Sequence, residues 1–239
     1  IFKHLNDHIL TIILGKYYSD KDAGYFSQAH KWNYMGHSLI SGMVNGVAQP
    51  VLVSTGDERE RLQRVFRKML RFTAFVSFPA MFGLSLTAPE LITLAITDKW
   101  LPSALFMQIL CIGGAFLPLS NLFSQLLLSR GHSSTYMWCT IALSVLQLAT
   151  AYIAYPYGIQ TMLLAFITVN TGWIVVWLHF VHREIGLTFF SFLKDICPYL
   201  LLSGGLVILA HYATLDIEST GIRLACKIAG VGGCYLFIL

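Results

Sequence analysis

The stretch TGDERERLQRVFRKMLR, from Thr55 to Arg71, is the one long, strongly basic interruption in an otherwise apolar sequence. Its apolar residues recur at helical spacing and gather on one face, which predicts an amphipathic helix. Thr55 and Glu58 have the spacing of a capping box, so we expect the helix to begin between them. We interpret it as a helix that lies at a membrane surface with its cations toward lipid head groups; the alternative is a solvated helix between two buried ones. Its basic residues are Arg59, Arg61, Arg64, Arg67, Lys68 and Arg71.

Composition points to a membrane protein. Of the 239 residues 56% are hydrophobic and only 12% are charged, against about 25% charged in soluble domains. The formal net charge of +4 comes mostly from the basic stretch, so we read it as a signal of topology and expect no nucleic-acid partner. Basic connectors of membrane proteins lie on the cytoplasmic side, which places this helix inside.

Long uncharged runs predict an all-α, polytopic bundle of about eight transmembrane helices, one of them partial, at about 20 residues for each crossing. The chain starts in the middle of an apolar pattern, so we expect an N-terminal part of the protein to be missing. We expect polar connectors at 16–32 and 183–195, and a crossing that starts at Phe72, after the basic helix. Residues 103–129 should form a single crossing, and residues 131–182 two crossings separated at Tyr155–Gly158.

Polar residues inside a membrane are costly, which makes them candidates for a functional site. The polar residues near the N-terminus could face a water-filled cavity. Alternatively, they could lie near the membrane interface and extend their charged ends into water. Farther along, amides could line a cavity for a hydroxyl-rich cargo, or they could bond between helices. The candidates for a substrate cavity are Lys3, His4, Asp7, His8, Asn45, Gln49, Asn121, Gln125 and Asn170.

Other patterns give weaker signals. Gly42 and Gly46 have the small-xxx-small spacing that allows close packing of a neighbouring helix. The histidine pairs lack a carboxylate or cysteine to complete a metal site, so we expect neither metal nor cofactor. We also find no arrangement of nucleophile and base, and we expect that the protein is not an enzyme.

Three segments together resemble bacterial polysaccharide biosynthesis flippases of the multidrug/oligosaccharidyl-lipid/polysaccharide exporter superfamily. APELI at 88–92 followed by DKWLPSA at 98–104 is similar to a connector of that family, although Asp98 stands where the family has glycine. ILGK at 13–16 with AGYFSQA at 23–29, and RFTAFVSFPAMFGL at 71–84, resemble two further segments.

The resemblance implies a fourteen-helix protein with two six-helix lobes and a final helix pair. By that comparison residues 1–195 are the second lobe, truncated at its N-terminus, and residues 196–239 are the final pair. The implied function is to move a lipid-diphosphate-linked oligosaccharide across the bacterial cytoplasmic membrane by alternating access. The implied partners are this polyprenyl diphosphate substrate, membrane lipids, and polysaccharide polymerase or assembly proteins.

Two alternatives stay open. One is a drug or metabolite antiporter of the same superfamily, which would have an acidic ion-coupling residue in the other lobe. The second is a membrane polysaccharide polymerase or acyltransferase, which would need catalytic residues in a large external loop.

Overall fold

The computed structural model of the chain describes residues 14–15, 18–56, 58–217 and 219–238. All regular elements in these residues are helices, which confirms the predicted all-α class. Short 3-10 turns cover Asp98–Trp100 and Tyr155–Tyr157. The α-helices are α2 (Asp20–Ser54), α3 (Arg59–Leu86), α4 (Ala88–Ala95), α5 (Pro102–Gly114), α6 (Leu117–Ser129), α7 (Ser133–Ala154), α8 (Ile159–Gly172), α9 (Ile174–Ile185), α10 (Phe189–Ala213) and α11 (Thr220–Ile238).

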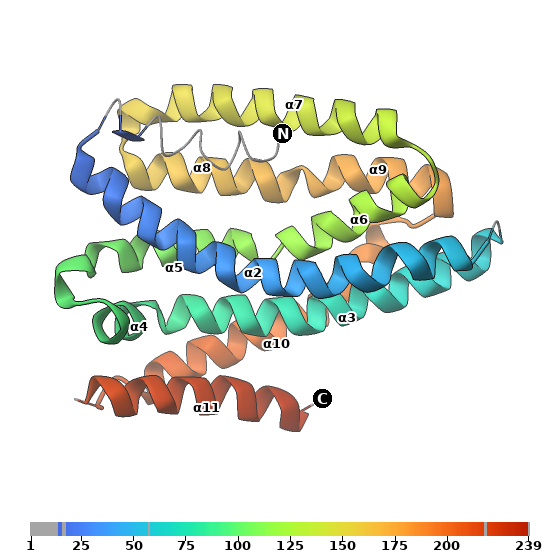
Figure 1. Cartoon of the computed structure of the whole chain (residues 1–239). Helices are drawn as coiled ribbons and strands as arrows, with labels where there is room; N and C mark the ends of the chain where they lie inside the picture. Colours follow the sequence, from blue (N-terminus) through green and yellow to red (C-terminus); the bar gives the residue numbers. More distant parts are fainter. Residues whose placement is uncertain (1–13, 16–17, 57, 218, 239) are drawn as a thin grey trace.

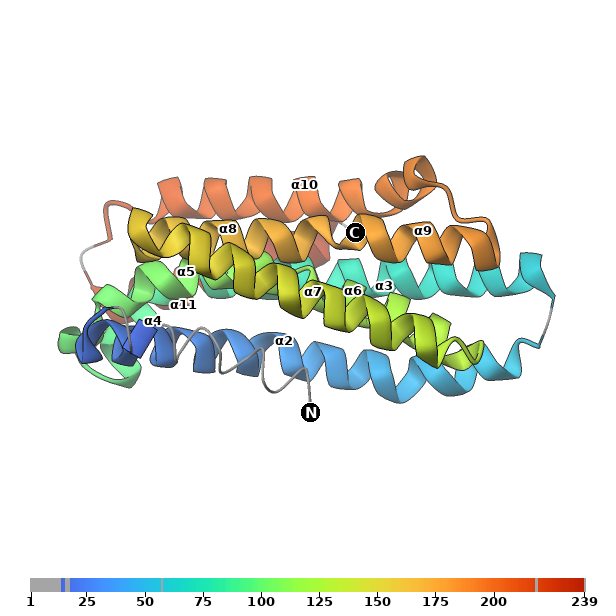
Figure 2. The same ribbon diagram turned by 90° about the horizontal axis from the view of Figure 1, so that it is seen from above.

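Five helical segments are long and apolar enough to cross a membrane, as a multi-pass protein requires. Two of them consist of consecutive helices in line, α5 with α6 and α8 with α9 (Figure 1). The long helices lie side by side and roughly lengthwise (Figures 1 and 2). The five segments are Arg59–Leu86, Pro102–Ser129, Ser133–Tyr157, Ile159–Ile185 and Phe189–Ala213.

Helix α3 is the element around which the bundle is packed, because it contacts α2, α5, α6, α9, α10 and α11. Its inner face carries Leu62, Phe66 and Leu70 in the basic half and continues with Phe78 and Met81, all fully or almost fully buried. The four-residue and three-residue steps between them keep these side chains on one side of the helix. The apolar face predicted for the basic stretch therefore packs into the protein core.

The basic stretch is not a separate helix, and this corrects the sequence interpretation. Residues 59–86 form one helix, so the residues that we expected to lie along the membrane surface continue directly into the crossing. Pro79 stays inside this helix. Neighbouring helices can compensate for the amide hydrogen bond that proline removes in such a bundle.

The predicted capping box is also absent. Glu58 is the residue before α3, and its side chain makes no capping hydrogen bond. The Thr55 hydroxyl instead donates to the carbonyl oxygen of Val51, 2.7 Å away, on the preceding helix. Gly56 has φ +69°, a left-handed conformation that glycine adopts without steric cost. The turn is thus made by glycine, and Thr55 belongs to the end of α2.

Both polar connectors are shorter than predicted. α2 begins at Asp20, where Ser19 caps it by accepting a hydrogen bond from the backbone N–H of Asp22 (3.2 Å). Asp20 and Asp22 lie in the first turn, where negative charge stabilises a helix. The second connector is reduced to residues 186–188, because α10 already starts at Phe189. The border predicted between lobe and final pair, at residues 195 and 196, therefore lies inside a helix.

Residues 103–129 form one apolar crossing, as predicted, but this crossing consists of two helices with a break at Ala115 and Phe116. Pro118 follows directly, and proline lacks the N–H that would continue the ladder of hydrogen bonds. By contrast, the turn predicted at Tyr155–Gly158 is confirmed, and Gly158 has φ +94° there.

The close approach of helices also occurs elsewhere than predicted. A Cβ atom on Gly42 or Gly46 would meet nothing within 4 Å among the described residues. A Cβ on Gly113 would lie 2.6 Å from Cγ2 of Ile167, and one on Gly114 would lie 2.3 Å from Oδ1 of Asn33. The glycines that permit the closest packing are therefore those at the end of α5.

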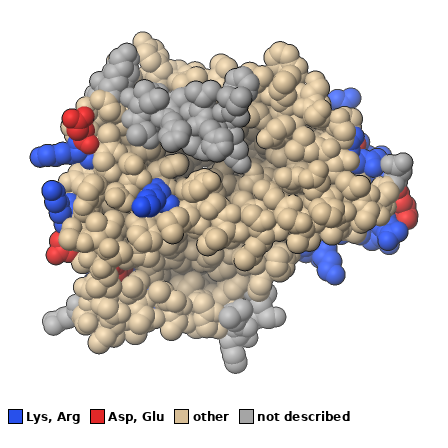
Figure 3. All heavy atoms as spheres, viewed as in Figure 1, with Lys and Arg blue, Asp and Glu red and all other residues tan. Residues whose placement is uncertain are grey.

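Charged side chains gather at the two ends of the molecule, and a broad uncharged surface lies between them (Figure 3). One end holds the connections after α2, α6 and α9, at residues 55–58, 130–132 and 186–188 (Figure 1). Arg130 Nη1 donates to the carbonyl oxygen of Gly56 (3.4 Å), and Arg59 Nη2 to that of Arg183 (3.2 Å). The basic start of α3, which the sequence places on the cytoplasmic side, thus lies at the same end as the other two connections.

Candidate functional site

The strongest candidate for a functional site is a cavity of about 460 Å³ inside the helix bundle. Its wall is built from α2, α5, α6, α7, α8 and the start of α9, whose ribbons can be followed in Figure 1. The glycines Gly113 and Gly114 form part of the wall, where the absence of side chains lets α5 approach its neighbours. The volume falls in the range of small-molecule sites, about 300–1,000 Å³.

Three of the amides predicted from the sequence lie in this wall, namely Asn45, Asn121 and Asn170. Asn170 accepts a hydrogen bond from Nε2 of Gln147 (2.8 Å), which joins α8 to α7. Asn121 donates to the hydroxyl of Ser41 (2.9 Å). The sequence left two roles open for these amides, hydrogen bonding between helices and lining a cavity. In the structure they have both roles.

The remaining predicted residues have three different outcomes. Gln125 is outside the wall but donates to Oδ1 of Asn45 (3.2 Å), so it supports a residue of the wall. Gln49 is exposed and does not line the cavity. Lys3, His4, Asp7 and His8 lie outside the described residues, and their predicted role in the cavity stays a prediction.

Part of the wall is aromatic, and the sequence did not predict this part. His30, Tyr34 and His37 occupy successive turns of α2, and their rings are in contact, with centroids 6.4 Å and 5.4 Å apart. On the opposite side Tyr136 stacks on Trp177 across α7 and α9, at 6.0 Å and 26°. The spacing of the α2 residues is a visible signal, but His30 falls in residues 16–32, for which the sequence predicts a polar connector.

The described residues of the wall include no Asp, Glu, Lys or Arg. The wall contains histidine and tyrosine side chains instead, namely His30, His37, Tyr34 and Tyr136. The described part of the chain also contains no group of three or more His, Cys, Asp or Glu residues placed to hold a metal ion. The arrangement offers hydrogen bonds and flat apolar rings, which suits binding of a polar, uncharged molecule.

The basic residues of α3 make structural contacts at the charged end. Asp195 of α10 is buried, and Arg67 binds both of its carboxylate oxygens, with Nε 2.7 Å from Oδ2 and Nη2 3.0 Å from Oδ1. Arg71 binds Oδ1 as well, at 2.7 Å and 2.8 Å. Arg61, Arg64 and Lys68 are exposed. The predicted contact of this stretch with lipid head groups stays a prediction.

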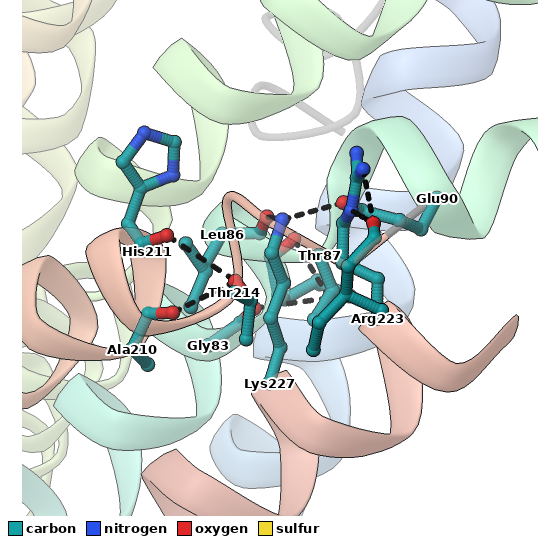
Figure 4. A network of polar contacts seen from close by, with 11 residues as sticks. Gly83, Leu86, Thr87, Glu90, Ala210, His211, Thr214, Arg223 and Lys227 are labelled. Carbon is teal, nitrogen blue, oxygen red and sulfur yellow. Dashed lines mark hydrogen bonds and ion pairs between the residues drawn. The ribbon is translucent and has the colours of Figure 1, made fainter. Parts of the chain in front are cut away.

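A second buried ion pair fixes the last helix (Figure 4). Nζ of Lys227 in α11 lies 2.6 Å from Oε1 of Glu90 in α4 and 3.1 Å from the carbonyl oxygen of Leu86. Both side chains are almost fully buried. Arg223, one turn before Lys227, donates to the carbonyl oxygen of Ile217. Glu90 is the acidic residue of the APELI motif, so part of that motif serves to hold α11.

Comparisons with known proteins agree with the motifs. A family model described as "Polysaccharide biosynthesis protein" matches residues 1–105. The chain is 25% identical over 246 residues to the teichuronic acid biosynthesis protein TuaB of Bacillus subtilis, a match that covers 100% of the chain and 50% of that protein. It is 24% identical over 130 residues to the lipopolysaccharide biosynthesis protein WzxC of Escherichia coli, covering 54% of the chain and 26% of that protein.

A third relative is an uncharacterized membrane protein in the cps region of Klebsiella pneumoniae, 29% identical over 130 residues, which are 54% of the chain and 27% of that protein. The chain spans at most about half the length of these curated relatives. No solved structure matches the chain. The three motifs, the helical architecture and these matches agree with the resemblance: the chain is similar to polysaccharide biosynthesis proteins, and its helices are those of a multi-pass protein of the bacterial inner membrane.

Proposed function

We propose that the protein to which this chain belongs moves a lipid-linked oligosaccharide from the inner to the outer leaflet of the cytoplasmic membrane. The match of residues 1–105 to a polysaccharide biosynthesis family model supports this function, as do relatives named for teichuronic acid and lipopolysaccharide biosynthesis. No covalent bond is made or broken in such a step, so the protein acts as a transporter and not as an enzyme.

The observation that carries the proposal is the polar cavity within an apolar bundle. Polar groups buried away from water cost about 1–3 kcal/mol each when they lack a partner. The bundle nevertheless retains amides and hydroxyls from α2, α6, α7 and α8 around one space. A hydroxyl-rich cargo that enters this space would exchange its hydrogen bonds with water for bonds to the wall.

The lipid part of the cargo would stay outside the bundle. Figure 3 shows a broad uncharged surface between the charged ends. Exposed apolar side chains of α2, α7 and α10, such as Leu39, Trp138 and Leu201, are compatible with lipid tails. The polyprenyl chain would remain in the bilayer while the head group crosses, as in transporters whose repeats rock around a central site. Polysaccharide polymerase or assembly proteins would then take the cargo on the outer side.

Replacing two paired amides of the cavity wall should impair transport. In Gln147→Leu/Asn170→Leu the hydrogen bond between α7 and α8 is lost together with the polar groups that it presents. Because both partners of this hydrogen bond become apolar, neither amide is left buried without the other, and the fold should be kept. We expect complementation of a flippase-null strain to fall at least about tenfold, the effect of losing about 1.4 kcal/mol of binding.

The matched control is Gln49→Leu, which removes an amide that α2 exposes outside the cavity. It should complement fully at the same membrane level. Proteoliposomes with a fluorescent lipid-linked oligosaccharide give a direct measure of translocation. Full translocation by the double variant, or no translocation by the unmodified protein, would contradict the proposal.

A further inference from the structure

The side chains of the cavity wall are suited to bind some chemical parts of a lipid-linked oligosaccharide and not others. Such a cargo contains neutral sugar rings, a diphosphate and, in some polymers, acidic sugars. Anionic groups bind where arginine, lysine or a metal ion meets them. No such side chain lines the cavity in the described part of the chain, so an anion placed there would lose its hydration without gaining a counter-charge.

Two polar atoms in the wall are buried and have no hydrogen-bond partner among the described residues. One is the indole N–H of Trp173, a donor, and the other is Oδ1 of Asn33, an acceptor. Asn33 is 5% exposed. Buried polar atoms in native proteins nearly always have a partner, so each marks a place where a bound molecule can complete a hydrogen bond. A sugar hydroxyl can both donate and accept, and it can therefore serve either atom.

The aromatic rings supply the second kind of contact that a sugar needs. Tyr136 and Trp177 stack on one side of the cavity, and Tyr34 lies between two histidine rings on the other. Large flat side chains present apolar area that is fixed in position and has a polar tip. The apolar face of a pyranose ring can pack on such a surface while its hydroxyl groups reach the amides around it.

We infer that this cavity is a saccharide site for uncharged sugar units, with Trp173 and Asn33 as contacts that no sequence motif indicates. The inference rests on the proposed function, which gives a lipid-linked oligosaccharide as the cargo. It adds that the uncharged sugar units are the part of this cargo that binds in the cavity. The diphosphate and any acidic sugars are held outside the cavity.

Calorimetric titration of the purified protein in lipid nanodiscs tests the site directly. The probes are the neutral disaccharides maltose, lactose and cellobiose, and digalacturonate as an acidic disaccharide of similar size, all at near-neutral pH. We expect at least one neutral disaccharide to bind at least about tenfold more tightly than digalacturonate. If digalacturonate binds equally well, or if no neutral disaccharide binds, the inference is wrong.

Trp173→Phe keeps the aromatic ring and removes the indole N–H, so it should weaken binding of the neutral sugar about fivefold, the value of one typical hydrogen bond. Trp32→Phe is the matched control, because the N–H of Trp32 is likewise buried without a described partner but Trp32 does not line the cavity. It should leave the affinity unchanged within about twofold. Equal effects of the two substitutions would indicate a general change of packing and overturn the assignment of Trp173.

Translocation assays on the same samples separate this inference from the proposed function. A protein that moves lipid-linked oligosaccharide but shows no binding of neutral sugar would refute the saccharide site and leave the flippase function standing. A protein that binds neutral sugar with the expected dependence on Trp173 but moves no lipid-linked oligosaccharide would refute the flippase function and leave the site standing.

Discussion

At the scale of single residues, two adjacent glycines decide how closely α5 can lie against its neighbours. A Cβ on Gly113 would be 2.6 Å, 2.9 Å and 3.2 Å from three atoms of Ile167, and the last of these is the Cβ atom of that side chain. Isoleucine is branched at Cβ and has few rotamers with which to move away. Gly42, which the sequence pattern favoured, has open space around it among the described residues.

Gly113→Ala should therefore destabilise the protein by about 1–3 kcal/mol, as overpacking of a core typically does. Gly42→Ala should be neutral or stabilising by about 0.5–1 kcal/mol, because alanine favours the helix interior over glycine. Thermal unfolding of both variants in the same detergent measures the difference. A lower melting temperature for Gly42→Ala than for Gly113→Ala would show that the packing described here is wrong.

At the scale of elements, two buried carboxylates, Asp195 and Glu90, form the ion pairs that attach α10 and α11 to the rest of the bundle. Asp195 of α10 meets Arg67 and Arg71 of α3 near the end with the basic stretch. Lys227 of α11 meets Glu90 of α4 toward the opposite end (Figures 1 and 4). Helix α10 is thus attached to α3 near one end of the bundle, and α11 is attached to α4 toward the other end.

Lys227→Met should be strongly destabilising, by about 3–5 kcal/mol, because it leaves the buried carboxylate of Glu90 without its cation. The double variant Glu90→Gln/Lys227→Met removes both charges and should recover much of this loss. Lys99→Met is the control, since Lys99 is exposed and its replacement should change stability by less than about 0.5 kcal/mol. Unfolding in a detergent series compares the three, and a double variant no more stable than Lys227→Met would argue against the ion pair.

At the scale of the whole molecule, the distribution of charge gives the orientation in the membrane. The basic start of α3 and the connections after α6 and α9 lie at one end, with Arg59 and Arg130 bonded to backbone carbonyls there. The turn at Asp98–Trp100 lies at the other end, beside α4 (Figure 1). The excess of Lys and Arg predicts that the first end is cytoplasmic.

Single cysteines at positions 60 and 98, in place of the exposed Glu60 and Asp98, should react from opposite sides of the membrane. The background lacks the native cysteines, of which Cys197, Cys226 and Cys234 are exposed. In intact cells an impermeant reagent should label position 98, and position 60 should react after the membrane is opened. The reverse pattern would invert the topology, and labelling of both in intact cells would contradict the bundle.

The sequence by itself determined what depends on neighbouring residues. Runs of apolar residues predicted the crossings, and the cluster at Tyr155–Gly158 predicted the turn between two of them. Element borders were less well determined, because the helix starts after Ser19 and Glu58 and the break before Pro118 depend on competition between nearby residues. The amides were identified because a polar residue in an apolar run is visible without any structure.

Tertiary structure alone decided which distant residues meet. Asp195 is buried against two arginines more than a hundred positions earlier, and Glu90 meets Lys227 across the bundle. The cavity likewise joins Asn33 and His37 of α2 to Gln147 and Trp173, which no local pattern relates. The physical reason is that hydrophobic burial along each helix specifies which face turns inward but not which partner lies there. The partner follows from the packing of all the helices at once.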